Sequence, residues 1–472
     1  MRLRLTSASH WWFVILLLVV AAKQIYVLTL IPPWQIPDEP AHFQYVQTLA
    51  EDHQAPVFSV VERDVSAELR ASFYRIQNRI KGSGKEHLPM ALYPEHPGIS
   101  DRQSAPVDQP VRSLAGAYGP VYYLVATIPY YLFYDVSIET RLLAVRALSS
   151  LTLLVVVWLA FRIGRRIRGP GFGLALAAMI GFMPMLGYLA AGVNNDIFLL
   201  LFSALVFDRL ARGLTSRLTW RDIVWLGVWA GLAALTKQHG WILAVAVTLS
   251  LFFQRRLLGW NTALKMLGVF FVLAFVIGAS WSVRGFLVDQ NNFISGEGVN
   301  VDNTRTTGTP REAGEIVAHI LFSRWPSVFV TFWGFFGWNG IATHYPWSLY
   351  YSLGLIASVL LVGCGLAWWR RDDVVAGQWL RLSVLTWATL EIVFLLTFWQ
   401  RAATYGIVTF PNQGRYYFPL LLPIMSAVLL AGESLVKRRY RAWAWAGMAV
   451  AMVGLSVWSI WPVMSAIFGG VI

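Results

Sequence analysis

Residues 31–43 read Ile-Pro-Pro-Trp-Gln-Ile-Pro-Asp-Glu-Pro-Ala-His-Phe and follow directly on the first long apolar run of the chain. Two adjacent carboxylates, Asp38 and Glu39, therefore lie where a membrane-spanning segment ends and a long polar segment begins. An apolar run fixes the depth of the residues that follow it, because its length must match the hydrocarbon layer. The sequence thus predicts two carboxylates at a membrane surface, at a fixed height.

A short helix is expected to begin at this point. Pro40 suits the first turn of a helix, where its missing N–H is not needed. Asp38 or Glu39 would then be the N-cap, whose carboxylate accepts backbone N–H bonds, and His42 would share a face with Asp38. The pattern is equally consistent with a capped surface helix that has no further role. An apolar stripe indicates that the helix lies on the membrane; it consists of Phe43, Val46 and Leu49.

The chain has 472 residues, of which 57% are hydrophobic and only 13% charged, and it contains 23 Trp. This composition excludes an ordinary soluble protein and indicates an all-α polytopic membrane protein. The single cysteine, Cys364, lies in an apolar run and excludes an intrachain disulfide. The net charge of +13 does not indicate a nucleic-acid partner, because most Lys and Arg residues lie in short loops, where they set orientation and meet anionic lipid.

Eleven apolar runs have the length and character of membrane spans. The first run follows Met1-Arg2-Leu3-Arg4, and no small-residue cleavage site comes after it, so we expect an uncleaved first helix. The eleven runs lie near 11–31, 142–161, 171–191, 196–211, 222–236, 240–254, 264–283, 348–369, 379–398, 416–434 and 443–464.

Two further runs, 118–134 and 325–343, carry several Pro, Gly, Tyr or Trp residues, and the topology depends on whether they cross. Short cytoplasmic loops are rich in Lys and Arg, and all five basic clusters fall on the side of the N-terminus only if neither run crosses. We therefore predict about eleven spans, a cytoplasmic N-terminus and an extracytoplasmic C-terminus, with both runs interfacial or re-entrant on the outer side. The clusters are Arg162, Arg165, Arg166 and Arg168; Arg209, Arg212, Arg217 and Arg221; Arg255, Arg256 and Lys265; Arg370 and Arg371; and Lys437, Arg438, Arg439 and Arg441.

This topology places the long loop 32–141 outside, together with loops 284–347 and 399–415. A loop as long as 32–141 between two spans is usually functional. Residues 295–310 are rich in Gly and Thr and are interpreted as a lid or a plain linker. No internal repeat is visible, so the sequence gives no support to an inverted-repeat transporter.

Polar groups gather at the outer ends of the predicted spans, at the depth of Asp38. Carboxylates suit a general base or a metal cation, and Lys or Arg suits a phosphate or pyrophosphate. Tyr and Trp side chains stack on sugars or form the interfacial aromatic belt. The groups are Asn194-Asn195-Asp196, Lys237-Gln238-His239, Trp281 with Arg284, and Gln413-Gly414-Arg415-Tyr416-Tyr417.

Each of these groups also has a purely structural interpretation. Asn194-Asn195-Asp196 would form a tight turn, Lys237 would extend to the lipid headgroups, and Arg415 would pair with an acidic residue at the rim. Two charges lie deeper, Lys23 in the first span and Glu391 in the ninth. They are candidates for function or for a structural ion pair, and they could contact each other.

Several elements occur together in this chain. They are the Asp-Glu pair after the first span, a long outer loop, the segment Pro120-Val121-Tyr122-Tyr123, Arg141 and Arg146 near the start of the next span, Asn195-Asp196 and Leu235-Thr236-Lys237. In this combination the chain resembles the GT-C superfamily of integral membrane glycosyltransferases. Within it, the chain is most similar to a bacterial group of membrane proteins of unknown function, which share the strings Pro-Asp-Glu-Pro-Ala-His-Phe (37–43), Phe-Trp-Gly-x-Phe-Gly-Trp (332–338) and Gln-Gly-Arg-Tyr-x-x-Pro (413–419).

The resemblance implies transfer of a sugar from a polyprenyl-phosphate donor to an envelope glycan, lipid or protein. The reaction would invert the anomeric carbon and take place on the extracytoplasmic face of the bacterial inner membrane. Asp38, with Glu39 second, would act as the base toward the acceptor or hold a divalent cation, Mg or Mn. The other implied site residues are an acceptor corner of His42, Asn195 and Asp196, a donor-phosphate site of Lys237, Arg284 and Arg415, and sugar or lipid contacts of Tyr122, Tyr123 and Tyr416.

The chain departs from the superfamily at one point. Many members carry His-Pro or Lys-Pro before the Tyr-Tyr pair, where this chain has Gly119-Pro120, and His96-Pro97 lies far upstream. Two other functions stay open: a lipid-linked sugar transporter or flippase, and a polymerase or ligase that uses a polyprenyl-pyrophosphate oligosaccharide. We expect three parts: a GT-C membrane module that includes the long outer loop (1–283), an extracytoplasmic loop with an interfacial segment (284–347), and C-terminal spans (348–472).

Overall fold

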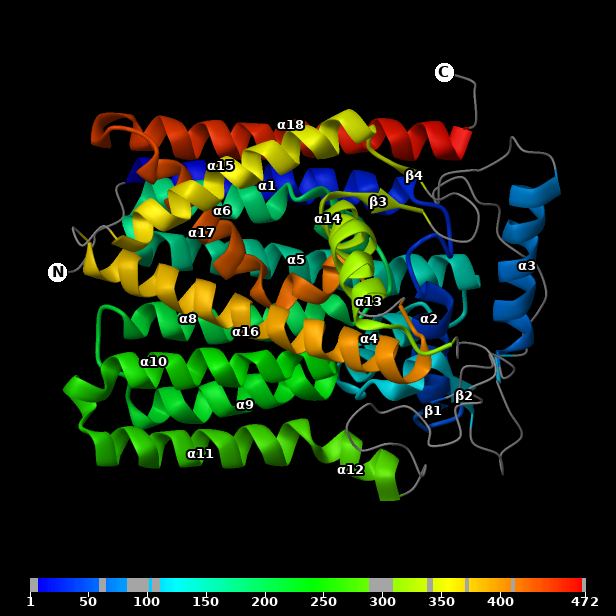
Figure 1. The fold of residues 1–472 in the computed structure, drawn as a ribbon. Coiled ribbons are helices and arrows are strands. Elements are labelled where there is room, and N and C mark those ends of the chain that lie inside the picture. Colours follow the sequence, from blue (N-terminus) through cyan, green and yellow to red (C-terminus); the bar gives the residue numbers. More distant parts are fainter. Residues whose placement is uncertain are drawn as a thin grey trace.

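The fold is almost entirely helical, as the apolar runs predict. The computed structural model describes residues 7–58, 65–82, 102–103, 111–287, 309–337, 343–369, 373–408 and 412–468; His96-Pro97 and most of the 295–310 segment lie outside these ranges. Long helices run side by side and form an elongated bundle (Figure 1). They are α1 (Ser7–Leu30), α5 (Ile138–Arg168), α6 (Pro170–Gly181), α7 (Pro184–Ala190), α8 (Asp196–Gly213), α9 (Trp220–Thr236), α10 (Ile242–Leu258), α11 (Trp260–Gly278), α15 (Trp347–Trp369), α16 (Val374–Tyr405), α17 (Leu421–Ser434) and α18 (Arg441–Phe468).

Each of the eleven predicted spans coincides with helix in this bundle. Among the described residues, nine helices are long and apolar enough to cross a membrane, or ten if α6 and α7 together form one span. Helices α8 and α9 do not meet that criterion, since α8 carries four charged residues and α9 has 17 residues. Both nevertheless run alongside the longer helices (Figure 1). The fold class predicted from the sequence, an all-α polytopic membrane protein, is therefore confirmed.

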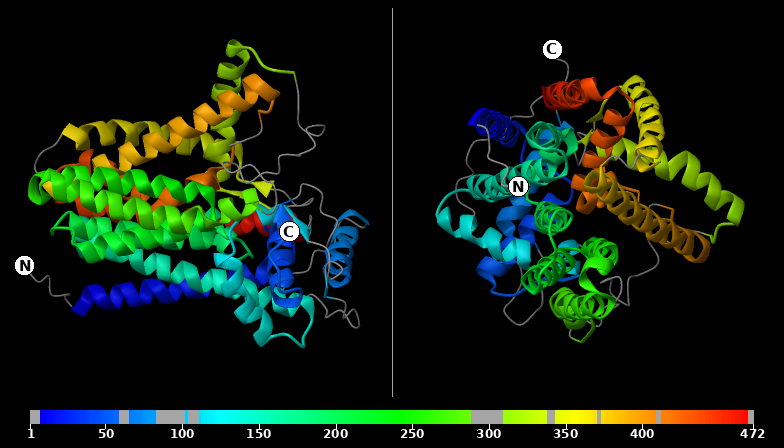
Figure 2. Two further views of the ribbon diagram at one scale, coloured as in Figure 1. Left: turned by 90° about the horizontal axis from the view of Figure 1, so that it is seen from below. Right: turned by 90° about the vertical axis from the view of Figure 1, so that its left-hand side faces the viewer.

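The two ambiguous runs differ in how much helix they contain. Residues 118–134 contain α4 (Val121–Leu132), whose 12 residues are too few to cross a bilayer. Residues 313–333 form a continuous helical segment of α13 (Ala313–His319), a π-helical turn (Ile320–Arg324) and α14 (Trp325–Trp333). By length and composition this segment qualifies as a span, but it runs across the bundle axis (Figures 1 and 2).

The span predicted at 171–191 is broken. Helices α6 and α7 meet at an angle of 60°, because Pro184 opens α7 and cannot donate to the preceding turn. Carbonyls on both sides of the break accept hydrogen bonds from α1: Lys23 Nζ donates to Gly181 O at 2.9 Å and Gln24 Nε2 donates to Gly187 O at 2.9 Å. Lys23 therefore stabilises the broken span, and it does not contact Glu391.

One end of the bundle, on the right of Figure 1, carries a cap of short elements from the first loop. They are α2 (Glu39–Glu51), β1 (Val57–Phe58), α3 (Ala67–Gly82), β2 (Arg112–Ser113) and the 3₁₀ turn η2 (Leu114–Ala117); β1 and β2 pair in parallel. A second small sheet, antiparallel, joins β3 (Phe335–Phe336) to β4 (Thr343–His344). Helix α12 (Ser280–Leu287) runs through the boundary predicted at residue 283, so the proposed division into three parts stays a prediction.

Helix α2 does not lie on the membrane, contrary to the expectation from its apolar stripe. Phe43 and Val46 are fully buried, because α2 packs against α4, α3 and η2. An apolar stripe reports only that one face is buried, and here protein rather than lipid covers it.

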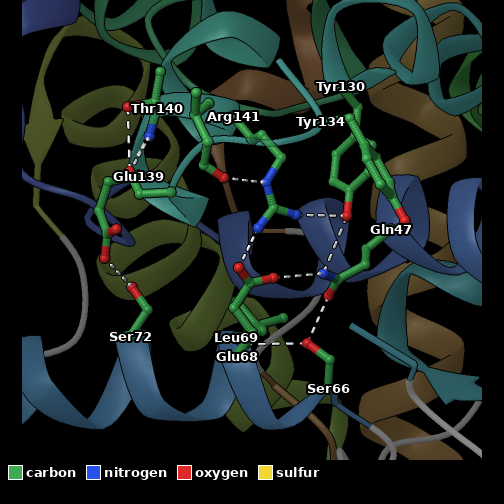
Figure 3. A network of polar contacts seen from close by, with 12 residues as sticks. Gln47, Ser66, Glu68, Leu69, Ser72, Tyr130, Tyr134, Glu139, Thr140 and Arg141 are labelled. Atoms are coloured by element: carbon green, nitrogen blue, oxygen red, sulfur yellow. Dashed lines mark hydrogen bonds and ion pairs between the residues drawn. The ribbon is translucent and has the colours of Figure 1, made fainter. Parts of the chain in front are cut away.

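A buried polar network fixes α3 against the rest of the cap (Figure 3). Arg141 of α5 forms an ion pair with Glu68 of α3 and donates to Tyr130 Oη at 2.6 Å. Gln47 of α2 donates to Glu68 at 3.2 Å and accepts from Ser66 Oγ at 2.7 Å. The described part of the loop 32–141 is thus a folded cap, held together by contacts among α2, α3, α4 and α5.

Candidate functional site

A cavity of about 240 Å³ lies at the capped end of the bundle. Its walls come from α2, η2, the 3₁₀ turn η3 (Gln238–Trp241) and the 3₁₀ turn η6 (Gly414–Leu420), which are far apart in sequence. Apolar run lengths alone placed these polar groups at one depth, and the structure gathers several of them around one space. The lining residues are Asp38, Ala41, His42, Phe58, Leu114, Ala115, Ala117, Tyr118, Lys237, Gln238, His239 and Tyr416.

Four charged side chains form an alternating chain at this cavity. Arg415 Nη2 donates to Asp38 Oδ2 at 2.7 Å, and Lys237 Nζ donates to Asp196 Oδ1 at 2.5 Å. The two pairs are linked because Arg415 Nη1 lies 3.9 Å from Asp196 Oδ2. The Asp38 side chain is 36% exposed, whereas the other three are at most 7% exposed. The cluster is electrically neutral, and Asp38 is its accessible carboxylate.

Asp38 has an unusual backbone conformation. It is the N-cap of α2 with φ 62° and ψ 10°, in the left-handed region, and its side chain makes no capping hydrogen bond. Asp tolerates this region better than most residues. The expected capping role of the Asp38 carboxylate is therefore wrong: the left-handed turn accompanies a carboxylate that binds Arg415 instead.

Asp38 is held as a carboxylate. Burial raises the pKa of the Asp38 carboxyl, but the nearby Arg415 guanidinium, with smaller contributions from His42 and Lys237, outweighs burial and brings the pKa below its usual value. Asp38 is therefore ionised at neutral pH, as a general base must be.

Glu39 lies outside the cavity and is fully buried. Its carboxylate accepts from Arg146 Nε at 2.7 Å and Arg146 Nη2 at 2.6 Å, and from the backbone N–H groups of Trp34 (3.0 Å) and Val193 (3.1 Å). Arg146 also donates to the carbonyls of Ile31 and Pro32. This bidentate pair joins the end of α1, the start of α2, α5 and the connection before α8, so Glu39 holds Asp38 in place and is not among the residues that line the cavity.

His42 does share the face of Asp38 and lines the cavity. Its Nδ1 lies 2.7 Å from Tyr123 Oη, and its ring lies nearly parallel to the rings of Tyr118 and Tyr123, with a centroid distance of 5.9 Å to each. Burial lowers the pKa of His42 to about 4. His42 is thus neutral near pH 7 and presents an uncharged imidazole to the cavity.

The predicted Tyr-Tyr pair lies behind the cavity wall. Tyr122 and Tyr123 are fully buried and are not among the lining residues. Tyr122 Oη lies 2.9 Å from Ser149 Oγ and accepts from the Asn194 backbone N–H at 3.2 Å. These tyrosines position His42 and the 192–195 connection, and this placement does not favour direct contact with a sugar.

Aromatic rings do line the cavity around Lys237. Its Nζ lies 5.3 Å from the centroid of Tyr118 and 5.5 Å from that of Tyr416. His239 stacks on Tyr416 at 4.9 Å, and no hydrogen-bond partner for its buried Nδ1 exists within the described ranges. Lys237 therefore does not extend to the lipid headgroups; it lies between two rings and against Asp196.

The Asn194-Asn195-Asp196 element is both a turn and a site element. Asn194 Oδ1 accepts from the Asp196 backbone N–H at 2.8 Å, and Asn195 Nδ2 donates to Thr236 O at 3.1 Å. These bonds fix the start of α8 against the end of α9. They direct Asp196 toward Lys237, whereas the Asn195 side chain holds the start of α8 against the end of α9.

Two predicted charges lie away from the cavity. Arg284 packs on the Trp281 ring at 4.5 Å and is not a lining residue. Glu391 accepts from Arg324 Nη1 at 2.7 Å and from Trp325 Nε1 at 3.0 Å. It lies 17 residues into α16, about 26 Å along the helix axis, and its partners belong to the segment that crosses the bundle. Glu391 is therefore paired with the segment that crosses the bundle axis.

The residues do not fit a protein-held divalent cation. The described residues contain no group of three or more His, Cys, Asp or Glu side chains that could bind a metal. Lys237 and Arg415 already occupy Asp196 Oδ1 and Asp38 Oδ2. The ligand role considered for Asp38 thus finds no supporting donor set in this part of the chain.

Some site residues were not predicted. Tyr118 and Phe58 line the cavity, and neither was among the predicted site residues. The sequence signal that could have identified Tyr118 is its position directly before the recognised Gly119-Pro120 segment. Phe58 has none, because only the pairing of β1 with β2 brings it to the cavity.

Comparison with known proteins gives one family and a set of structural neighbours. The family model described as "Predicted membrane protein (DUF2142)" matches residues 23–425. The crystal structure of ArnT from Cupriavidus metallidurans in the apo state is 13% identical with a TM-score of 0.52, and the match covers 98% of this chain and 78% of that chain. The same protein bound to undecaprenyl phosphate gives 14% identity and a TM-score of 0.49, covering 98% and 74%.

The oligosaccharyltransferase of Archaeoglobus fulgidus in a complex with Zn and sulfate is 14% identical, with a TM-score of 0.48 and coverage of 96% of this chain and 53% of that one. The chain therefore spans only part of the length of that protein. A search of curated proteins gives no significant match. The likeness to apo ArnT shows that the chain has a GT-C polytopic membrane fold.

Proposed function

The chain belongs to the DUF2142 family of predicted membrane proteins, and on that premise we propose that it is a GT-C type glycosyltransferase of the bacterial inner membrane. It moves a sugar from a polyprenyl-phosphate donor to an envelope glycan, lipid or protein, with the site outside and the N-terminus in the cytoplasm. The observation that carries the proposal is the cluster of Asp38, Arg415, Asp196 and Lys237 beside a cavity at the capped end of the bundle. The accessible carboxylate can act as a base, and the two neighbouring cations can bind a phosphate.

Lys237 and Arg415 would hold the donor phosphate. Both cations are already paired with carboxylates, so a phosphate binds by taking over part of those contacts. Asp38 is the exposed partner and yields first, whereas Asp196 stays buried against Lys237. Arg415 can offer two parallel N–H groups to phosphate oxygens, and cations aimed at the leaving phosphate stabilise charge that grows in the transition state.

Asp38 would act as the base. The acceptor hydroxyl oxygen attacks the anomeric carbon, its proton passes to Asp38, and the bond between the anomeric carbon and the phosphate oxygen breaks. The lipid phosphate leaves with that electron pair toward Arg415 and Lys237. Attack opposite the leaving group inverts the anomeric centre. The neutral His42 and the stacked pair of His239 and Tyr416 supply walls and hydrogen-bonding groups for sugar hydroxyls.

The transporter alternative finds less support. It rested on Lys23 and Glu391 as charges within a path across the bilayer. Lys23 hydrogen-bonds the break between α6 and α7, and Glu391 pairs with Arg324 in the segment that crosses the bundle axis. Neither side chain therefore forms part of a polar path from one side of the bundle to the other.

The test is donor consumption by the purified full chain, reconstituted with radiolabelled polyprenyl-phosphate sugars and a bacterial envelope lipid extract. Asp38→Asn is expected to lose ~100-fold or more in rate because it removes the base. Asp135→Asn removes an exposed aspartate outside the cavity and serves as the matched control with wild-type rate. Transfer by Asp38→Asn at the wild-type rate would refute the assignment of the base.

A second arm uses polyprenyl-pyrophosphate oligosaccharides as donors. Consumption of these and not of the monophosphate donors would identify a polymerase or ligase. If every donor stayed intact with folded protein, the glycosyltransferase proposal would be wrong.

A further inference from the structure

A second cavity, of about 150 Å³, lies at the opposite end of the bundle from the candidate site. It is enclosed by the end of α5, the start of α16, the end of α17 and the start of α18, which meet on the left of Figure 1. No step of the proposed reaction uses it. The lining residues are Arg168, Ala367, Asp373, Ala376, Gly377, Leu380, Leu430, Glu433, Ser434, Arg438 and Arg441.

The charges in this cavity do not balance. Arg168 forms ion pairs with both acidic residues, Asp373 and Glu433, the latter at 2.6 Å. Arg438 and Arg441 line the same cavity, and within the described ranges neither forms an ion pair or donates a side-chain hydrogen bond. The buried Nε of Arg441 has no partner there either. Among the described lining residues, three arginines face two carboxylates, so this lining carries one net positive charge.

The surroundings indicate that the opposite charge belongs to a lipid. The deeper wall is apolar, with Leu380 and Leu430 buried. Trp369 at the end of α15 and Trp443 in the first turn of α18 are 79% and 76% exposed, as expected of tryptophans at the level of lipid headgroups. A cavity at this depth meets lipid phosphates, and basic pockets between membrane helices bind anionic headgroups.

We propose that this cavity binds the phosphodiester headgroup of an anionic membrane lipid, held by Arg438 and Arg441. A singly charged phosphodiester matches the single net positive charge of this lining. Arg168 keeps its two carboxylate partners and forms the floor of the site. Binding would join α16, α17 and α18 at the end of the bundle where the proposed orientation places the cytoplasm.

The test is native mass spectrometry of the purified full chain in detergent, titrated with phosphatidylglycerol, phosphatidylcholine or inorganic phosphate. Wild type is expected to bind phosphatidylglycerol ~10-fold or more tightly than phosphatidylcholine, and Arg438→Gln with Arg441→Gln is expected to lose ~10-fold or more of that affinity. The matched control is Lys437→Gln with Arg439→Gln, which removes two exposed charges from the same turn but no lining residue, and should stay within about twofold of wild type.

A second variant blocks the cavity and keeps every charge. Gly377 lines the cavity, and a Cβ added there would meet no atom within 4 Å, so Gly377→Leu is designed to add side-chain volume at the cavity wall and also favours the helix. It is expected to weaken phosphatidylglycerol binding ~5-fold or more by excluding the headgroup. Equal losses in the cavity and control pairs would overturn the proposal, because general surface charge would then explain binding. Binding of inorganic phosphate as tightly as lipid, or wild-type lipid binding by Gly377→Leu, would also overturn it.

Discussion

Glu39→Gln is expected to lower the free energy of unfolding by about 3–5 kcal/mol, because it breaks a buried ion pair. Asp38→Asn, one residue earlier, is expected to change the same quantity by less than about 1 kcal/mol, because its partner contact is partly exposed to solvent. For donor consumption we expect the opposite ranking among folded molecules: Asp38→Asn is inactive, whereas Glu39→Gln retains measurable transfer. The two variants would thus assign a chemical role to the Asp38 carboxylate and a structural role to the Glu39 carboxylate.

The magnitude for Glu39 follows from its contacts. Its two oxygens accept four hydrogen bonds, two from Arg146 and two from backbone N–H groups, and both side chains of the pair are 0% exposed. A glutamine keeps the shape but replaces one accepting oxygen with an NH₂ group that faces donors. Arg146 would then be a buried cation whose remaining partners are the carbonyls of Ile31 and Pro32.

The assay is unfolding in mixed micelles followed by tryptophan fluorescence, with donor consumption measured on the same preparations. The double variant Glu39→Gln with Arg146→Gln is expected to recover at least about 1 kcal/mol relative to additivity, since removal of both charges leaves none unpaired. Asp135→Asn again serves as the neutral control. If Glu39→Gln is as stable as wild type, or additivity holds within about 0.3 kcal/mol, the pair does not hold the site together.

Four further outcomes are expected. The pKa of Asp38 is lowered, so its ionised form persists as pH falls through the usual aspartate value; initial rates should be flat from about pH 8 to pH 5 and decline only below about pH 4. Lys237→Met removes a phosphate contact and leaves Asp196 without its 2.5 Å partner, and should raise the donor KM ~10-fold or more in steady-state assays. Tyr123→Phe deprives His42 Nδ1 of its 2.7 Å partner and should cost about 1–2 kcal/mol in the unfolding assay. Arg141→Gln leaves Glu68 buried without its ion pair, should cost about 3 kcal/mol, and should speed proteolysis of α3.

The bundle and the depth of the site could be predicted from the sequence because both follow from run length. A span must match the hydrocarbon thickness, so residues at span ends share a depth whatever the packing of the helices. Asp38, Lys237 and Arg415 are separated by up to 377 residues, yet their positions at span ends were sufficient to group them. The same reasoning could not choose between neighbours at one depth, and it therefore included Arg284, which packs on Trp281.

Partner choice depends on rotation about helix axes and on how short elements pack, and neither is encoded in run length. Glu39 and Arg146 are 107 residues apart, and nothing local distinguishes Glu39 from Asp38 as the buried member of the pair. Likewise, the stripe of α2 indicates a buried face but not whether lipid or protein covers it. Glu391 lies within a predicted span, and nothing in that apolar run indicates that its partner is Arg324, 67 residues earlier in the chain.

Because Asp38 has a left-handed backbone conformation, the choice of substitution determines whether a variant tests only the chemistry of the carboxylate. A side chain at an ordinary N-cap accepts hydrogen bonds from the first turn of the helix, and such a carboxylate would have its oxygens committed to the backbone. Here the turn at φ 62° accompanies a carboxylate with no capping bond, so one oxygen binds Arg415 and the carboxylate can reach an acceptor. Alanine at this position would lose the carboxylate and also incur a backbone penalty of about 1 kcal/mol, because most residues disfavour this region. Asparagine tolerates the left-handed region as aspartate does and differs from it only in the ionisable oxygen. A loss of transfer in Asp38→Asn therefore reports the base itself, whereas the same loss in an alanine variant would leave the geometry of α2 as an equally good explanation.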